Sequence, residues 1–193
     1  MTTIALASAS PRRRELLTQL GVNYQLVKID VDETQLPDEV AADYVLRLAK
    51  AKAAAGLQAV DGKMPALGAD TIVVVDGLVL GKPKDHADFT RMMKLLSGRS
   101  HQVMTAVAIA DESTLHAVTV STDVWFSVLS DDEIAQYWLS GEPQDKAGGY
   151  GIQGIAGRFI EKINGSYFAV VGLPLYETAQ LLGRLTKAGQ GAL

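Results

Sequence analysis

Three consecutive arginines follow a Ser-Pro step near the start of the chain. Arg12, Arg13 and Arg14 come directly after Ser10 and Pro11, between an apolar run and an apolar helical pattern. Serine is a good N-cap residue and proline suits the first helical position, so we expect a helix to begin here. The guanidinium groups and the free backbone N–H groups of its first turn would converge on one point, which favours binding of a phosphate. For an isolated arginine cluster, a solvated basic turn is the competing interpretation.

Acidic and basic side chains also occur where loops meet regular elements. Asp70 lies between two apolar runs of one predicted strand, where a carboxylate without a partner would cost desolvation energy. Glu33 lies on an acidic turn, and the two carboxylates together could hold a divalent cation through hard oxygen ligands. Lys52 lies on a long predicted helix, and Lys82 is fixed between a glycine and a proline. Carboxylates that hold a metal, together with cations that bind oxyanions, suit a polyphosphate substrate. Considered singly, Glu33 and Lys52 are equally well explained as solvated surface charges.

Two glycine-rich segments match nucleotide-binding motifs only in part. Residues 149–154 fit the G-x-G-x-x-G pattern, but a dinucleotide site needs a strand before and a helix after, and the flanking residues predict neither. Residues 77–83 resemble a P-loop, but the spacing is one residue short and Pro83 replaces the Ser or Thr that would hold magnesium. We therefore reject both a Rossmann and a Walker site. The three histidines are dispersed and lack zinc-ligand spacing.

The composition of the chain limits its class and location. With 193 residues, 48% apolar and 21% charged, the chain can bury a sizeable core in a single domain of residues 1–193, which could form two lobes around a central cleft. It contains no cysteine, which excludes disulfides and thiol catalysis. The sequence has no signal segment and no apolar run of the ~20 residues needed to span a bilayer, so we expect a soluble, cytoplasmic protein without membrane contact. The net charge of −4 disfavours general attraction to nucleic acid.

Apolar periodicity predicts alternating helices and strands. The expected helices are 11–20, 38–57, 86–96, 131–139 and 174–187, and the expected strands are 24–29, 66–75, 78–80, 102–110, 117–129 and 158–163. The apolar face expected on the second helix consists of Tyr44, Leu48, Ala51 and Ala55. A capping box at Ser130 and Glu133 starts the fourth helix, and Asp76-Gly77 is a hairpin turn. Because both hairpins and helices connect the strands, we expect a mixed α/β fold whose elongated, partly antiparallel sheet is flanked by helices.

Eight short segments, taken in order, resemble the Maf family over nearly the whole length of the chain. These segments are Ser8–Arg13, Val31–Glu33, Ala49–Ala53, Gly68–Thr71, Gly81–Pro83, Leu96–Gly98, Lys146–Gly154 and Val171–Pro174. Each segment alone is weak evidence, but eight in order make the resemblance specific. It implies a fold like that of Maf and inosine-triphosphatase proteins, and hydrolysis of a nucleoside triphosphate to the monophosphate and pyrophosphate. It also implies a divalent metal cation, Mg²⁺ or Mn²⁺, and a homodimer.

The resemblance implies roles for individual charged residues. Asp70 would be the general base that activates water for attack on the α-phosphorus, or a metal ligand that orients this water, and the sequence does not separate these roles. Glu33 would help to hold the metal. Arg13, Lys52 and Lys82 would neutralise the phosphate charge that grows toward the leaving pyrophosphate.

A second group of residues is implied in substrate binding and base selection. Arg12, Thr71 and Gln153 resemble the set found in the dTTP/UTP-hydrolysing branch of the family rather than the 7-methyl-GTP branch, and Ser8 is also expected to contact substrate. A glutamine amide offers one donor and one acceptor, which can pair with the N3–H and O4 edge of uracil or thymine. A site built on such hydrogen bonds rejects bases that leave its polar groups unpaired. Arg14 has no assigned role.

Three other functions stay open at this point. A purine or modified-nucleotide pyrophosphatase of the same family would share every catalytic residue and differ in the base pocket. A regulator of cell division would bind the nucleotide as a ligand rather than a substrate. The arginine run alone suggests a nucleic-acid-binding module, but the acidic net charge and the aromatic content of 6% argue against it.

Overall fold

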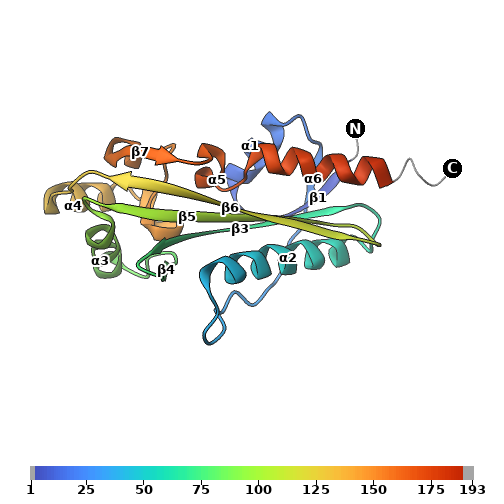
Figure 1. The fold of residues 1–193 in the computed structure, drawn as a ribbon, viewed down its shortest axis with the longest axis horizontal. Coiled ribbons are helices and arrows are strands. Elements are labelled where there is room, and N and C mark those ends of the chain that lie inside the picture. The colour runs from blue at the N-terminus through green and yellow to red at the C-terminus, as the bar shows by residue number, and fades with distance from the viewer. Residues whose placement is uncertain (1–2, 189–193) are drawn as a thin grey trace. The chain divides into compact units, whose positions relative to one another are not determined.

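The structure, a computed structural model, describes residues 3–188 of the chain (Figure 1). Its helices are α1 (Pro11–Gln19), α2 (Ala41–Ala59), α3 (His86–Leu96), α4 (Asp131–Leu139), α5 (Tyr167–Val171) and α6 (Leu175–Ala188). Its strands are β1 (Ile4–Ala7), β2 (Tyr24–Leu26), β3 (Ala66–Val75), β4 (Leu78–Leu80), β5 (Ser100–Ala110), β6 (Leu115–Phe126) and β7 (Ile160–Asn164). Three short 3₁₀ helices, η1 (Glu142–Asp145), η2 (Ala147–Gly149) and η3 (Ile155–Phe159), connect α4 to β7.

The strands form one mixed sheet. Their order is β2-β1-β3-β5-β6-β7, and β4 pairs with β3 beside this path. β1 is parallel to β2 and to β3, and the helices α1 and α2 provide the crossovers that parallel neighbours require. β4 is antiparallel to β3, and β7 is antiparallel to β6. The expected mixed, partly antiparallel sheet with flanking helices is therefore confirmed.

The chain divides into two compact units. Of the described residues, the first unit contains residues 3–70, 105–120 and 172–188, and the second contains Thr71–Met104 and Ser121–Val171. The division falls inside β3, β5 and β6, so each of these strands supplies residues to both units. The single-domain organisation stays a prediction. No helix in residues 3–188 is both long and apolar enough to cross a membrane.

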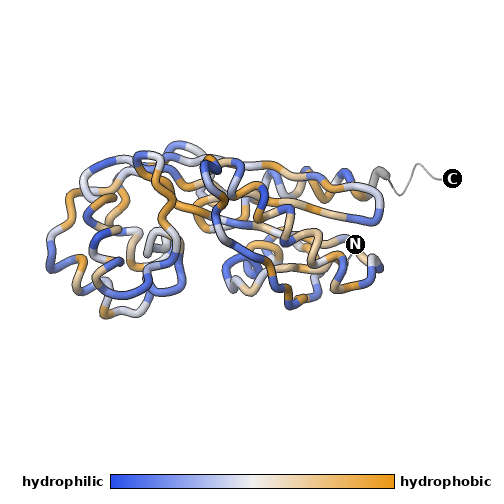
Figure 2. The backbone as a smooth tube through the Cα atoms, turned by 90° about the horizontal axis from the view of Figure 1, so that it is seen from below, coloured by the Kyte–Doolittle hydropathy of each residue, from blue (hydrophilic) through white to orange (hydrophobic). Residues whose placement is uncertain are grey.

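In the first unit, α2 and α6 lie on opposite sides of the strands (Figure 1). All four residues of β1 are buried, as are Ala66 to Asp70 of β3, which fits parallel strands covered on both faces. Hydrophobic residues follow the extended segments, and hydrophilic residues predominate in the loops (Figure 2). The helix α2 begins at Ala41 rather than at the expected Asp38, because Asp38 has a φ of +57°, which a right-handed helix does not accommodate.

The buried face of α2 differs from the expected one. Its buried residues are Val45, Leu48, Ala49, Lys52, Ala53 and Gly56. Of the expected face only Leu48 is buried, whereas Tyr44, Ala51 and Ala55 are half-buried, so that prediction is wrong. A Cβ at Gly56 would lie 2.7 Å from the nearest side chain of β1. The helix thus packs closely on the strands through its smallest residues, which apolar periodicity does not identify.

The second unit has an aromatic core. Its buried members include Phe89, Phe126, Tyr137, Tyr150 and Phe159, together with Met92, Met93 and Leu96 of α3. The expected capping box of α4 is confirmed, since Ser130 and Glu133 exchange hydrogen bonds between side chains and backbone. The expected glycine-rich stretch folds into 3₁₀ turns, and η3 delays the start of β7 by two residues. The sequence did not predict α5.

His101 of β5 is the one histidine buried in this core among the described residues. Its side chain is 3% exposed, and its Nε2 lies 2.6 Å from the hydroxyl of Tyr150. The ring meets the edges of Phe126 and Tyr150, and its Nδ1 has no hydrogen-bond partner within residues 3–188. Burial, assisted by the positive charge of Arg99, lowers the pKa of His101 to about 4. The imidazole is therefore neutral in the folded protein near pH 7.

We expect His101 to make the folded state sensitive to mild acid. The unfolded chain takes up the proton near the ordinary pKa of 6.5, whereas the folded chain resists it down to about 4. Above pH 6.5 this residue does not lower the free energy of unfolding. As the pH falls from 6.5 to 4, the free energy of unfolding decreases by up to about 3 kcal/mol, at ~1.4 kcal/mol per pKa unit. Urea unfolding at pH 7 and at pH 4.5 should show a weaker pH effect in His101→Gln than in the unmodified protein. An equal pH effect in both proteins would contradict the role of His101 in acid sensitivity. His86→Gln, at an exposed histidine, is the control.

Candidate functional site

Lys52 lies between two carboxylates in the first unit. Its Nζ is 2.7 Å from Oδ1 of Asp70 and 2.7 Å from Oε1 of Glu33. The side chains of Lys52 and Asp70 are 11% and 12% exposed, whereas that of Glu33 is 58% exposed. The expected partner of the buried Asp70 is thus an ammonium group. Three of the residues that the sequence predicts for the site, Glu33, Lys52 and Asp70, meet at one point.

Gly68 explains why Lys52 reaches Asp70. It lies two residues before Asp70 in β3, and side chains two residues apart in a strand point to the same face. A Cβ on Gly68 would overlap the backbone N of Ala53 and would lie 2.5 Å from the backbone O of Ala49. Only glycine allows the backbone of α2 to lie this close to β3. The close contact places Lys52, the neighbour of Ala53, over the carboxylate.

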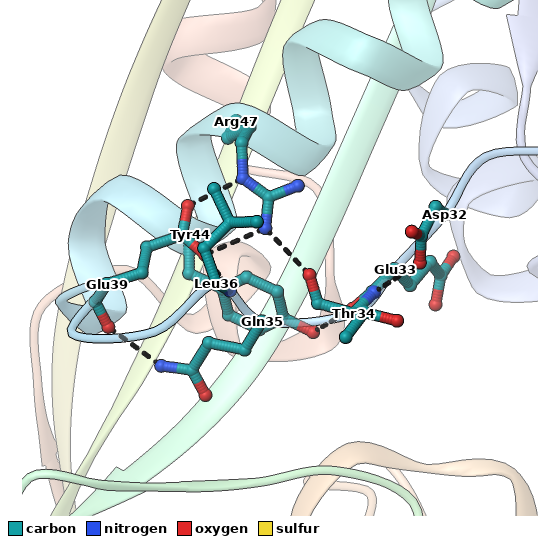
Figure 3. Close-up of polar contacts among 8 residues, drawn as sticks. All are labelled: Asp32, Glu33, Thr34, Gln35, Leu36, Glu39, Tyr44 and Arg47. Atoms are coloured by element: carbon teal, nitrogen blue, oxygen red, sulfur yellow. Dashed lines mark hydrogen bonds and ion pairs between the residues drawn. The ribbon is translucent and has the colours of Figure 1, made fainter.

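The loop that carries Glu33 is held by side chains of α2 (Figure 3). Arg47 donates to both carboxylate oxygens of Glu39, at 2.6 and 2.7 Å, and its Nη2 also donates to the carbonyl O of Thr34 at 3.0 Å. The hydroxyl of Tyr44 donates to the carbonyl O of Glu33 at 2.7 Å. The backbone on both sides of the loop is therefore tied to one helix face, which fixes the exposed Glu33 beside Lys52.

The pKa shifts of Glu39 and Tyr44 agree with the contacts that hold the loop. The hydrogen bond from Arg47 lowers the pKa of Glu39, so the carboxylate stays ionised. Burial, followed by the negative charges of Asp70 and Glu33, raises the pKa of Tyr44, so its hydroxyl stays a donor. Sequence reasoning missed these three supporting residues. The i,i+3 spacing of Tyr44 and Arg47 on α2 is the signal that could have indicated them.

Arg13 is fixed at the start of α1. Its Nε donates to the carbonyl O of Gly172 at 2.8 Å, and its Nη1 donates to the hydroxyl of Ser8 at 3.2 Å. Burial of the guanidinium lowers the pKa of Arg13, the charge of Asp70 opposes this effect, and the adjacent Arg12 adds to it. An arginine remains protonated under such a shift, so the site keeps this positive charge. The structure thus joins Arg13 to Ser8 and places the Arg13 charge within electrostatic reach of Asp70.

The N-terminus of α1 departs from expectation in one respect. Ser10 occupies the N-cap position and Pro11 the first turn, as predicted, but the hydroxyl of Ser10 makes no capping hydrogen bond. Instead, the backbone N–H of Ser10 donates to the hydroxyl of Ser8 at 3.2 Å. The first turn also contains no acidic residue. The backbone N–H groups of the first turn of α1 therefore have neither a side-chain cap nor a nearby carboxylate of that turn, and such a helix N-terminus favours binding of an anion.

Of the other predicted residues, Arg12 is half-buried in α1 of the first unit, and Thr71, Lys82 and Gln153 belong to the second unit. Thr71 is half-buried in β3, and Lys82 is exposed after β4, where the carbonyl O of the preceding Gly81 accepts from the backbone N–H of Gly148 at 2.9 Å. Gln153 is exposed on a turn between η2 and η3. The roles of these four residues stay predictions.

A metal site would need groups beyond the protein side chains. Within residues 3–188 no group of three or more His, Cys, Asp or Glu side chains is arranged to hold a metal ion. Glu33 and Asp70 fit a Mg²⁺ ion of the kind that takes one or two carboxylates and completes its shell with water and substrate phosphate. The Lys52 ammonium offsets one of their two negative charges.

Comparison with known proteins finds a family, named relatives and a solved structure to which this chain is similar. The family described as Maf-like protein matches residues 3–185. The dTTP/UTP pyrophosphatase of Pseudoalteromonas translucida is 60% identical over 179 residues, which cover 93% of this chain and 95% of that protein. The dTTP/UTP pyrophosphatase of Vibrio vulnificus is 56% identical over 182 residues, which cover 94% and 98%. The solved structure of the Staphylococcus aureus Ham1 protein aligns with 64% of this chain and 71% of its own, with a TM-score of 0.46 and 14% identity.

The ion cluster predicts an asymmetry between two substitutions. Lys52→Gln removes the cation that contacts the nearly buried Asp70, and breaking such a buried ion pair typically costs about 3–5 kcal/mol of the free energy of unfolding. Asp70→Asn should cost less, because Lys52 keeps Glu33. The double variant should lose less free energy of unfolding than the two single variants lose in sum. Urea unfolding at pH 7 measures all three.

A matched control is available on the surface. The Lys63–Asp61 pair is 74% and 79% exposed, so Lys63→Gln should leave stability unchanged. The charge assignment is wrong if Lys52→Gln is no more destabilising than Lys63→Gln, or if Asp70→Asn costs more than Lys52→Gln.

Proposed function

The chain belongs to the Maf family, and we propose that it is a pyrophosphatase that hydrolyses dTTP and UTP to the nucleoside monophosphate and pyrophosphate. The observation that carries the proposal is the meeting of Lys52 with the carboxylates of Glu33 and Asp70. Relatives that share 54–60% identity over most of the chain are named dTTP/UTP pyrophosphatases, which supports this substrate class. The substrate is therefore a small-molecule nucleoside triphosphate.

Asp70 acts on the attacking water in this proposal. Its Oδ1 is engaged by Lys52, so Oδ2 is the atom that takes the proton if Asp70 is the general base. The water oxygen then bonds to the α-phosphorus, and the bond from this phosphorus to the bridging oxygen breaks. Pyrophosphate leaves with the electron pair of that bond. If Asp70 is a metal ligand instead, it orients the same water.

A divalent cation, Mg²⁺ or Mn²⁺, belongs to the proposal. Glu33 and Asp70 would hold it, and when bound it supplies positive charge to the triphosphate and the leaving pyrophosphate. In this proposal the Lys52 ammonium, which contacts both carboxylates in the free protein, also neutralises phosphate oxygens of the bound substrate.

The remaining residues bind and select the substrate in this proposal. Ser8 and Arg13 present a hydroxyl and a guanidinium at the start of α1, where the helix N-terminus also favours a phosphate. Lys82 adds a further cation. Gln153 pairs with the N3–H and O4 edge of uracil or thymine, and Arg12 and Thr71 complete the selective set. A cytoplasmic location and a homodimer are part of the same proposal, and the homodimer rests on the family resemblance.

A nucleotide-panel assay with product identification tests the reaction. We expect release of pyrophosphate from dTTP and UTP in the presence of Mg²⁺ and its loss after chelation. Asp70→Asn should lower turnover by about 10²–10⁴, the range typical of general acid–base catalysis. Asp76→Asn, which changes an exposed carboxylate at the β3–β4 turn, is the control. Near-normal turnover in Asp70→Asn would refute its role, and binding without turnover in the unmodified protein would favour the regulator instead.

Gln153→Glu tests the base selection. A carboxylate cannot donate to O4, so kcat/KM should fall more for dTTP and UTP than for the other nucleotides. Gln144→Glu, at an exposed glutamine of η1, should leave the preference unchanged. An equal loss across all nucleotides would show instead that Gln153 has a structural role.

A further inference from the structure

Glu142, the first residue of η1, binds both ends of the turn that carries Gln153. Its Oε2 accepts from the backbone N–H of Ile155 at 2.9 Å. Its Oε1 accepts from the hydroxyl of Tyr137 at 2.8 Å, and the same hydroxyl accepts from the backbone N–H of Gly151 at 3.3 Å. One carboxylate therefore holds the far end of the turn directly and the near end through a tyrosine.

The turn itself is short and closed. The backbone N–H of Gly154 donates to the carbonyl O of Gly151 at 3.0 Å, which makes Gln153 the third residue of a four-residue turn. A Cβ on Gly154 would overlap the Glu142 carboxylate. The backbone of the turn thus lies directly against Glu142, and any side chain at position 154 would displace it.

The anchor is rigid on its other side. Tyr137 is 1% exposed, and its ring packs against Phe89 and Phe159 at centroid distances of 5.9 and 5.4 Å. Burial, followed by the hydrogen bond to Glu142, raises the pKa of Tyr137, so the hydroxyl stays protonated and donates. The Nζ of Lys146 donates to the carbonyl O of Glu142 at 2.6 Å, which also fixes the backbone of η1.

A carboxylate suits this position for a chemical reason. Both groups that face its two oxygens, the Ile155 N–H and the Tyr137 O–H, are donors. Glutamate is acceptor-only when ionised, whereas glutamine would turn one donor group toward another donor. Replacement by glutamine should therefore keep one of the two hydrogen bonds, and replacement by alanine should remove both.

We propose that Glu142 is a positioning residue for base selection, which fixes the turn so that the Gln153 amide presents its donor and acceptor in one orientation. This inference rests on the proposed function of Gln153. Gln153 is exposed, so packing of its own side chain does not orient it. An amide pair selects a base edge only when its geometry is held, because a mobile amide also accommodates the wrong edge.

The test combines a selectivity measurement with a direct measurement of the turn. We expect Glu142→Ala to lower the ratio of kcat/KM for dTTP to that for dCTP by at least about tenfold, the effect of a lost hydrogen bond or two. The loss should lie mainly in KM for dTTP. Amide hydrogen exchange of residues 151–155 should become faster in the same variant. Glu142→Gln should be intermediate in both measurements, and it is the variant to use if Glu142→Ala does not fold.

Glu161→Ala is the matched control, since it removes an exposed glutamate of β7 in the same unit. Unchanged amide exchange in both Glu142 variants would overturn the anchor. Faster exchange with unchanged selectivity would overturn the role in base selection. If Gln153→Glu shifts the preference and Glu142→Ala does not, only the positioning inference fails. If neither shifts it, the proposed role of Gln153 fails as well.

Discussion

The contact between α2 and β3 at Gly68 is the constraint on which the candidate site depends. Asp70 lies in a strand segment that is buried on both faces, where an unpaired carboxylate would be strongly unfavourable. Its cost is offset by Lys52, which reaches it only because the helix backbone lies directly against a residue without a Cβ. The same placement leaves the Lys52 ammonium open to a second carboxylate, that of Glu33. A packing requirement thus determines where the charges meet.

Charge balance explains why such a site is stable before a substrate arrives. Glu33 and Asp70 carry two negative charges, and Lys52 together with Arg13 carries two positive ones within electrostatic reach. A triphosphate with its divalent cation brings charges of both signs, so each protein group can exchange its present partner for one on the substrate. The groups that stabilise one another in the free protein are then the groups proposed to bind and to react. Groups that serve both stability and substrate binding must be held in a fixed geometry, because attraction between buried charges does not by itself offset the cost of removing them from water.

Local chemistry in the sequence predicts those features whose causes are local. The capping box at Ser130, the positions of α3 and β3, and the need of Asp70 for a partner all follow from neighbouring residues, and the structure confirms them. The buried face of α2 does not follow, because the close approach selects small residues rather than the expected Tyr44. The supporting residues of the loops were also missed. Glu142 contacts a backbone 13 residues away, and no periodicity indicates such a contact.

Two loops of the protein, one in each unit, are held in position by the same kind of contact. Glu33 and Gln153 are both exposed, so close packing does not fix their side chains, and their positions depend on how the backbone of each loop is held. In each case an acidic residue outside the proposed chemistry accepts from the backbone, Glu39 from the N–H of Leu36 and Glu142 from that of Ile155. Each carboxylate is held in turn by a side chain of a neighbouring helix. The roles proposed for these two exposed side chains depend on residues that touch no substrate. Substitutions at the supporting residues alone should therefore change the proposed base selectivity and metal binding.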